Sequence, residues 1–227
     1  MLAPEPLRDT LAAAGLGPGR RRLVLLLSQL GDFDSLEYAQ ALVPALPRLE
    51  AAGIAVLAIA IGNTAGADRF CTYTGLPRPL LQVEPEPQLH RRLGLYAGLQ
   101  TAGGPWPALL LMCAGIGSPG TLAEVLRGYT GDRTAPQRLA GAPFSALGEG
   151  YQRPFELATV RLRNMQEVLA RWRTYVPSDR WITQRGGTFL LDADDSLLYS
   201  HRDPGILGFS ATMAEPLRFL EPWLDRM

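Results

Sequence analysis

Two cysteines, Cys71 and Cys113, carry the side chains of this 227-residue chain that are best suited to redox chemistry. A cysteine thiolate can attack a peroxide or a disulfide, so either residue could be catalytic. The chain has no further cysteine with which to build a metal cluster or a disulfide framework. Free cysteines among apolar neighbours usually pack as small buried hydrophobes. We expect that role for both, with a relocated reactive thiol as the alternative.

Oxygen-bearing side chains gather in the segment Gly31-Asp32-Phe33-Asp34-Ser35, at the start of a predicted helix. Asp and Ser are preferred N-cap residues, and each contributes about 1 kcal/mol to helix stability. Asp34 and Glu37 have the spacing of a capping box, with Asp in place of Ser or Thr. A capped helix N-terminus is also an anion site. The segment is therefore a set of helix caps, a polar site, or both.

The first half of the chain reads as a βαβ unit that positions this segment. The apolar runs Leu23–Leu27 and Ile54–Ile61 do not alternate with polar residues, which suits strands buried on both faces. The helix between them extends to about Ala52 and is expected to bend near Pro44 and Pro47. Helices over 6–15, 65–74 and 86–94 and a strand over 80–83 complete this half.

The second half begins with a segment over about 98–154 that is rich in Gly, Pro and small residues, with a helical stretch at Thr121–Tyr129. We interpret it as an insertion within a single domain spanning residues 1–227. A long amphipathic helix over 155–175 follows. Its expected inward face is apolar, and Arg161, Arg163, Arg171 and Arg173 lie around the other faces. That inward face consists of Leu157, Val160, Met165, Val168, Leu169 and Trp172.

A β-hairpin and a last helix close the chain. The hairpin pairs Thr188–Asp192 with Leu197–His201 through a turn at Ala193–Ser196, and the last helix covers Ala211–Leu224. His90 and His201 have no metal-ligand spacing around them, so we expect no metal site and no cofactor.

Three local features suggest a family. They are the strand and loop Leu25–Gly31, the positions Gly62, Asp68, Arg69, Phe70 and Gly75-Leu76-Pro77, and the segment Arg185–Asp192 with its partner Tyr199–His201. Together they resemble peroxiredoxin-like proteins of the alkyl hydroperoxide reductase/thiol-specific antioxidant (AhpC/TSA) family, most closely those of cyanobacteria and plastids. The resemblance covers roughly residues 20–95 and 155–222. It implies an α/β thioredoxin-like sandwich with a central mixed sheet, and an active-site arginine at Arg185.

The chain departs from this family at the redox loop. Many peroxiredoxin-like proteins read Gly-Cys-x-x-Cys before the helix, and the aligned positions here are Asp32 and Ser35. The resemblance implies a thiolate stabilised by the helix N-terminus and an arginine. A carboxylate keeps the negative charge but cannot pass through a sulfenic acid. A serine without a neighbouring base is a poor nucleophile. Without the thiolate, Arg185 is expected either to pair with Asp32 or to lie on the surface.

Two classes of function remain. In the first, which we favour, the protein has lost the peroxidatic thiol and serves as a non-catalytic binding, assembly or regulatory module. In the second, it is an antioxidant oxidoreductase that reduces peroxide or disulfide through Cys71 or Cys113. Whether the protein is an enzyme stays open at this point.

Composition restricts the partners and the location. The 22 basic residues, all arginine, balance 22 acidic ones, so nothing draws the chain toward nucleic acid. No signal peptide and no apolar run of about 20 residues is present, so we expect a cytoplasmic protein without a transmembrane segment. The resemblance to cyanobacterial and plastid proteins implies an unknown protein partner near photosynthetic membranes, with the protein peripheral to the thylakoid membrane.

Overall fold

The computed structural model describes residues 1–117, 149–205, 209–211 and 215–224. Over 149–158 it describes the backbone alone. Most of the expected insertion, including the helix expected at Thr121–Tyr129, lies outside these residues. Its first part contains a helix, α6 (Pro105–Cys113).

The centre of the structure is a five-stranded mixed sheet. Its spatial order is β3-β2-β1-β4-β5, so β1 occupies the middle. The strands β1, β2 and β3 run parallel, whereas β4 and β5 form an antiparallel hairpin against β1. The strand bounds are β1 (Arg21–Gln29), β2 (Ile54–Ile61), β3 (Leu81–Glu84), β4 (Gly187–Leu191) and β5 (Leu197–Arg202). The predicted βαβ unit and hairpin are both confirmed.

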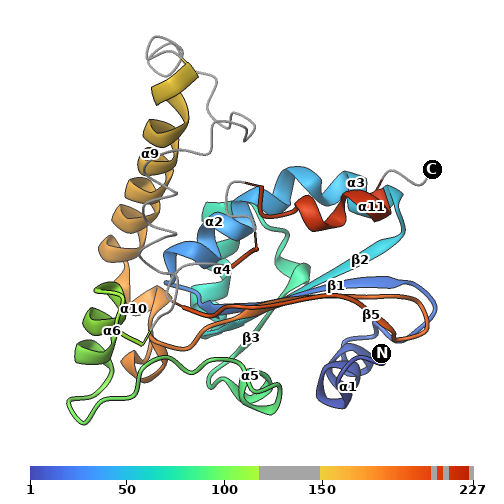
Figure 1. Ribbon diagram of the computed structural model, residues 1–227, viewed down its shortest axis with the longest axis horizontal. Helices are drawn as coiled ribbons and strands as arrows, with labels where there is room; N and C mark the ends of the chain where they lie inside the picture. The colour runs from blue at the N-terminus through green and yellow to red at the C-terminus, as the bar shows by residue number, and fades with distance from the viewer. Residues whose placement is uncertain (118–148, 206–208, 212–214, 225–227) are drawn as a thin grey trace.

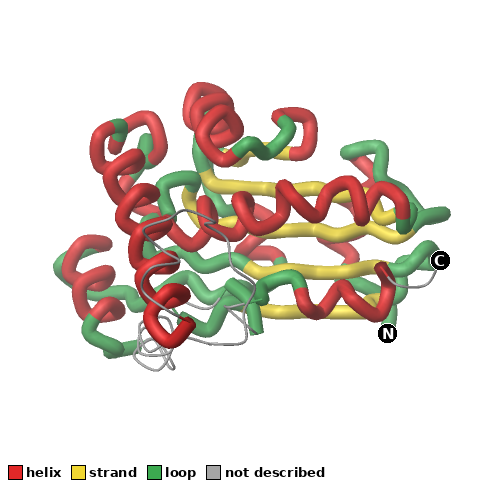
Figure 2. Tube along the Cα trace, turned by 90° about the horizontal axis from the view of Figure 1, so that it is seen from above, coloured by secondary structure: helices red, strands yellow, loops and turns green. Residues whose placement is uncertain are grey.

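Helices cover both faces of the sheet (Figures 1 and 2). The larger layer contains α2, α3, α4 and α11, and the smaller layer on the opposite face contains α1 and α5. The bounds of these helices are α1 (Glu5–Ala13), α2 (Phe33–Leu42), α3 (Leu46–Ala51), α4 (Thr64–Thr74), α5 (Gln88–Arg92) and α11 (Glu221–Leu224). A 3-10 turn at Val43–Ala45 separates α2 from α3, which is the bend that Pro44 and Pro47 predict.

Alternating residues of β1 enter two separate hydrophobic cores. Leu23 and Leu25 face the larger helix layer, whereas Val24 and Leu26 face α1 and α5, and all four are buried. Side chains of a strand point alternately to the two faces, so a central strand must be apolar throughout. This is why the run Leu23–Leu27 shows no alternation. No helix in the described part of the chain is long and apolar enough to cross a membrane.

The long helix near the C-terminus differs from the prediction in both extent and orientation. It begins earlier, as α9 (Glu149–Ala170), and a break at Arg171 separates it from the short α10 (Trp172–Tyr175). Val168 is fully buried, but Met165 and Leu169 are exposed, and Asn164 is buried instead. The predicted apolar inward face is therefore wrong for those two residues.

Polar groups on the neighbouring helices explain this orientation. α2 presents the buried carboxylates of Asp34 and Glu37, and Arg161 of α9 lies 3.2 Å from each of them. Buried carboxylates need partners of opposite charge, so the arginine turns inward and the leucines turn outward.

The predicted C-terminal helix is much shorter than expected. Among the described residues from 209 to 224, helical structure is confined to a 3-10 turn at Arg218–Leu220 and to α11. The carbonyl of Pro216 accepts a hydrogen bond of 3.1 Å from the Ser210 hydroxyl, which belongs to an irregular segment. A proline in this position supplies no backbone donor and interrupts helix formation, so the prediction is wrong for Ala211 and for residues 215–217, while residues 212–214 lie outside the described residues.

Gly186 brings the start of the hairpin against the end of β1. A Cβ atom on Gly186 would lie 1.9 Å from the backbone oxygen of Leu26, a distance that no real side chain permits. The next residue, Gly187, pairs with Leu26 in the sheet. The close approach of these two backbones therefore requires glycine at position 186.

We predict that Gly186→Ala lowers the free energy of unfolding by about 1–3 kcal/mol or more, because the strands must separate to admit the methyl group. Gly17→Ala is the control, since a Cβ there meets nothing within 4 Å. We expect it to change stability by less than about 0.5 kcal/mol. Urea unfolding measures both variants, and equal stabilities would contradict the close-approach argument.

Candidate functional site

Asp32 is the residue that caps α2 at its N-terminus. Its Oδ2 atom accepts hydrogen bonds from the backbone N–H of Ser35, at 3.3 Å, and from the Ser35 hydroxyl, at 3.2 Å. The cap therefore lies two residues before Asp34, which the capping-box spacing had suggested as an N-cap. Asp34 instead lies inside the first turn, where its carboxylate is buried and contacts Arg161. A carboxylate in the position of Asp32 is favoured because the first N–H groups of the helix have no partner within it.

Arg185 lies directly beside this cap, in the segment that precedes β4. Its side chain is only 3% exposed, and its Nη1 atom is 3.4 Å from Asp32 Oδ1. The rest of the guanidinium donates to backbone carbonyls, at 3.3 Å to Thr183 and 3.2 Å to Ile182. The structure thus brings Asp32, Ser35 and Arg185 together and places Arg185 in the interior.

Asp203 is a further acidic group of this site, and the sequence analysis did not select it. It follows β5 and is buried, with Oδ2 accepting a hydrogen bond of 3.0 Å from the backbone N–H of Gly186. Its Oδ1 atom makes no hydrogen bond and lies 3.5 Å from Nε2 of His201. Burial raises the pKa of Asp203 to about 7, although the nearby Arg185 charge and the Gly186 N–H act in the opposite direction.

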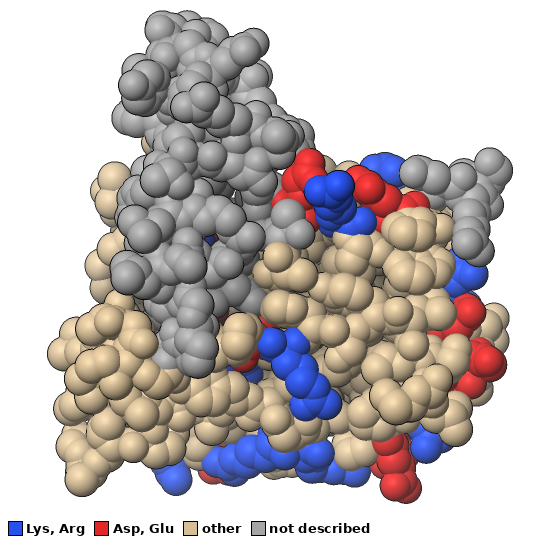
Figure 3. Space-filling model, in the orientation of Figure 1, with Lys and Arg blue, Asp and Glu red and all other residues tan. Residues whose placement is uncertain are grey.

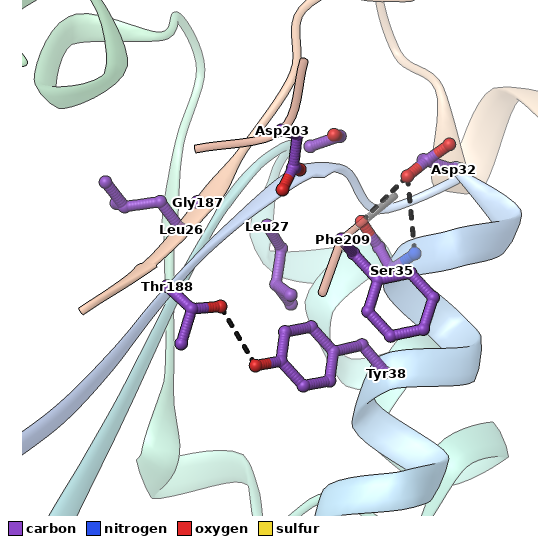
Figure 4. Close-up of a pocket in the computed structure, with 10 residues that line it drawn as sticks. Leu26, Leu27, Asp32, Ser35, Tyr38, Gly187, Thr188, Asp203 and Phe209 are labelled. Atoms are coloured by element: carbon purple, nitrogen blue, oxygen red, sulfur yellow. Dashed lines mark hydrogen bonds between the residues drawn. The ribbon is translucent and has the colours of Figure 1, made fainter. Parts of the chain in front are cut away.

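Asp32, Ser35 and Asp203 line a small pocket (Figure 4). It contains about 220 Å³ of empty space, including solvent at its mouth, and little room for more than one water-sized molecule. Asp32 and Asp203 lie near one end, and a 2.9 Å hydrogen bond between the Tyr38 and Thr188 hydroxyls lies at the other. The lining residues are Leu26, Leu27, Ser28, Asp32, Ser35, Tyr38, Gly187, Thr188, Asp203 and Phe209. The pocket can hold a small hydrogen-bonding molecule and offers it carboxyl and hydroxyl groups.

The two cysteines occupy different environments, and neither lines the pocket. Cys71 is 8% exposed in the larger core, as expected of a small buried hydrophobe, and burial raises the pKa of its thiol. Cys113 is exposed at the end of α6, so the expected burial is wrong for this residue. Partial desolvation raises the pKa of Cys113 as well, but the charge of Arg185 is near enough to act in the opposite direction. The charges that act on the Cys71 thiol are instead those of Arg78 and Asp68.

The raised pKa of Asp203 gives a prediction for the pH dependence of stability. An unfolded chain releases this proton near the ordinary value of 3.8, whereas the folded protein keeps it until about pH 7. Between pH 3.8 and about pH 7 the folded state therefore binds one more proton than the unfolded chain. The contribution of Asp203 to the free energy of unfolding falls as the pH rises through this range. Asp203→Asn, which keeps a neutral side chain at all pH values, should therefore gain stability relative to wild type by up to roughly 4 kcal/mol above about pH 7.

Urea unfolding at about pH 5 and about pH 8 gives the free energy of unfolding of wild type and of Asp203→Asn. The stability difference between the two proteins is then compared at the two pH values. Subtracting the two curves removes the contributions of other titrating groups, such as Asp34, whose pKa burial also raises. A stability difference that is the same at both pH values would show that Asp203 titrates as an ordinary surface carboxyl.

Comparison with known proteins adds an independent observation. The family described as AhpC/TSA antioxidant enzyme matches residues 41–205, which is well over half of the chain. The match begins inside α2, after Asp32 and Ser35, and includes both cysteines and Arg185. Neither the curated proteins nor the solved structures give a match.

The mixed five-stranded sheet with helices on both faces is the thioredoxin-like α/β arrangement that this family implies. The fold and the matched segment agree, and the matched segment extends from α2 through both strands of the hairpin. The chain belongs to the AhpC/TSA antioxidant enzyme family.

Proposed function

We propose that this protein is a member of the family that has lost the usual peroxidatic thiol and serves as a non-catalytic binding, assembly or regulatory module. One observation carries the proposal. The carboxylate of Asp32 occupies the position between the N-terminus of α2 and the Arg185 guanidinium. In the thiol-dependent members that the sequence resembles, this is where a thiolate would be stabilised.

The chemistry of the groups present supports this proposal. A carboxylate has no sulfur to oxidise, so it cannot accept oxygen from a peroxide and be regenerated by a thiol. Ser35 does have a carboxylate beside it, because its hydroxyl donates to Asp32 Oδ2. The oxygens of that carboxylate are already occupied, because Asp32 pairs with Arg185 and accepts a hydrogen bond from the Ser35 N–H. Ser35 is also only 3% exposed, so a substrate cannot easily reach its hydroxyl.

We predict that a cysteine placed at position 32 acquires a low pKa. In a Cys71→Ser/Cys113→Ser background, Asp32→Cys should titrate at least about one pH unit below the ordinary thiol value near 8.5. The helix N-terminus and Arg185 both favour the thiolate, and ultraviolet absorbance of the thiolate measures its titration. Hydrogen peroxide should then form a sulfenic acid at position 32, which wild type cannot do there.

Asn63→Cys in the same background is a matched control. Asn63 caps α4 as Asp32 caps α2, with its side chain accepting a 2.9 Å hydrogen bond from the Gly66 N–H. This control shares the effect of a helix N-terminus but is not paired with an arginine in the capping contacts described. If the thiols at positions 32 and 63 had equal pKa values, Arg185 would not stabilise an anion at position 32.

A second candidate function is thiol-dependent reduction of peroxide or disulfide. The exposure of Cys113 and the nearby charge of Arg185 favour it, and they favour Cys113 over Cys71. Against it stands the net upward shift in the pKa of Cys113, which leaves less thiolate at neutral pH. We therefore rank it second.

The two candidates differ in the effect of cysteine substitution. Under the proposal, wild type and the Cys71→Ser/Cys113→Ser double variant should reduce hydrogen peroxide and a model disulfide at the same background rate. The measurement is a steady-state assay with dithiothreitol as the reductant. Turnover in wild type that disappears in Cys113→Ser and persists in Cys71→Ser would overturn the proposal and establish the second candidate.

We extend the proposal to location and partner. A chain with only two thiols, neither in a disulfide, suits a reducing compartment such as the cytoplasm. A protein partner at the periphery of photosynthetic membranes rests only on the resemblance to cyanobacterial and plastid proteins. The equal number of acidic and basic residues gives no support to a nucleic acid as partner.

A further inference from the structure

Asp203 has one carboxyl oxygen that the surrounding structure does not satisfy. The residue is only 8% exposed, and its Oδ2 atom accepts a hydrogen bond of 3.0 Å from the Gly186 N–H, which fixes the orientation of the carboxyl group. Among the described residues, Oδ1 has no hydrogen-bond donor. Buried polar groups in folded proteins are almost always paired with a donor, an acceptor or an ion. The Oδ1 atom is therefore an acceptor that a ligand can satisfy.

This oxygen faces the small pocket between β4 and the start of α2. In Figure 4 the carboxyl group of Asp203 points into the space that the lining side chains enclose. That space has room for little more than one water-sized molecule. The ring of Phe209, which is 5% exposed and lies 4.7 Å from the ring of Tyr38, forms an apolar part of the wall. Electrostatic attraction is stronger in such an enclosed space than in bulk water.

The polar side-chain atoms in the described lining of the pocket are all oxygens. They belong to the hydroxyl groups of Ser28, Ser35, Tyr38 and Thr188 and to the carboxyl groups of Asp32 and Asp203. An anionic ligand would meet two carboxyl groups here and no cationic side chain among the lining residues. Oxygen ligands suit hard cations. The lining therefore favours a cation over an anion.

The charges at this site leave one negative charge unbalanced when Asp203 is ionised. The carboxylate of Asp32 is paired with Arg185, at 3.4 Å. Nε2 of His201 lies 3.5 Å from Oδ1 of Asp203, and this ring balances the charge of Asp203 only when it is protonated. Burial is the largest cause that raises the pKa of Asp203 to about 7. One monovalent cation in the pocket would balance the remaining charge.

The size of the pocket argues against other ligands. Ca²⁺ takes about six to eight oxygen ligands, and Mg²⁺ keeps several of its waters, so both need more room than one water-sized space. Within the described residues, no group of three or more His, Cys, Asp or Glu side chains is arranged to hold a metal ion. A water molecule could donate to Oδ1 but would leave its charge unbalanced. The histidine spacing that argues against a metal site does not concern oxygen ligands of this kind.

We propose that this pocket binds one monovalent cation of the size of sodium, potassium or ammonium, with Oδ1 of Asp203 as its charged ligand. The hydroxyl oxygens of the lining supply neutral ligands. Because Asp203 is tied to the N–H of Gly186, and Asp32 caps α2, the bound cation would stabilise the junction between the hairpin and that helix. The proposal is independent of the proposed function, since it requires neither cysteine and no loss of a thiol.

Urea unfolding at about pH 8, where Asp203 is ionised in the folded protein, tests the proposal. Sodium, potassium or ammonium chloride replaces tetramethylammonium chloride at constant ionic strength, and the tetramethylammonium ion is too large for a water-sized space. Above its dissociation constant, a ligand that binds only the folded state raises the folding equilibrium constant about tenfold for each tenfold increase in its concentration. We expect this dependence in wild type for at least one small cation, and the strongest response identifies the preferred ion.

Asp203→Asn should abolish this dependence. The amide oxygen can accept the hydrogen bond from the Gly186 N–H, which turns the NH₂ group toward the pocket, where it repels a cation. Asp9→Asn is the matched control, because it also removes a carboxylate that lies 3.4 Å from an arginine, Arg92. Asp9 lies on α1, on the opposite face of the sheet, and its side chain is 58% exposed. Asp9→Asn should respond to the cations as wild type does, and circular dichroism checks that both variants are folded.

Two results would overturn the proposal. One is a wild-type stability that is the same in all four chlorides, which would leave only water as the occupant of the pocket. The other is an equal dependence in wild type and Asp203→Asn, which would assign the effect to the protein surface. On the face shown in Figure 3, acidic side chains of the described residues lie beside basic ones and form no extended acidic patch. A general attraction of cations to this face is therefore expected to be weak.

Discussion

The buried guanidinium of Arg185 determines which groups must surround it in the site. A charge that is 97% removed from solvent is strongly destabilising unless anions and carbonyl oxygens surround it. Two carbonyl groups of its own loop and the carboxylate of Asp32 supply that environment. Because Asp32 also caps α2, the ion pair joins the helix start to the hairpin start. The close contact between Gly186 and Leu26 holds this arrangement against the central strand.

The sequence predicted the sheet well because burial on both faces leaves a simple pattern. Leu23–Leu27 and Ile54–Ile61 are apolar throughout, and the prolines near position 45 mark the bend between α2 and α3. The orientation of α9 could not be predicted in the same way. Its outward leucines are a consequence of Asp34, Glu37 and Arg69, which lie on other helices and require polar partners. Periodicity within one helix contains no information about the charges on its neighbours.

The candidate site shows the same division between local and long-range information. Asp32 and Ser35 could be identified from their place before a helix, and Arg185 from the resemblance of its segment to a known hairpin. Asp203 gave only a weak signal, an acidic residue immediately after a strand. Its hydrogen-bond partner, the N–H of Gly186, is 17 residues away in sequence, and its raised pKa comes from burial in the folded structure. The exposure of Cys113 likewise depends on how α6 packs, which its uniformly apolar sequence does not reveal.

The geometry around Asp32 has a consequence for how function should be assigned in this fold. A helix N-terminus and a buried arginine stabilise any anion placed between them, whether it is a thiolate or a carboxylate. The same arrangement therefore supports catalysis with one and structural pairing with the other. The identity of a single side chain decides between them, because only sulfur can be oxidised and reduced in a cycle. A family match that begins at residue 41 does not include that side chain, so membership in the family and possession of its activity are separate conclusions.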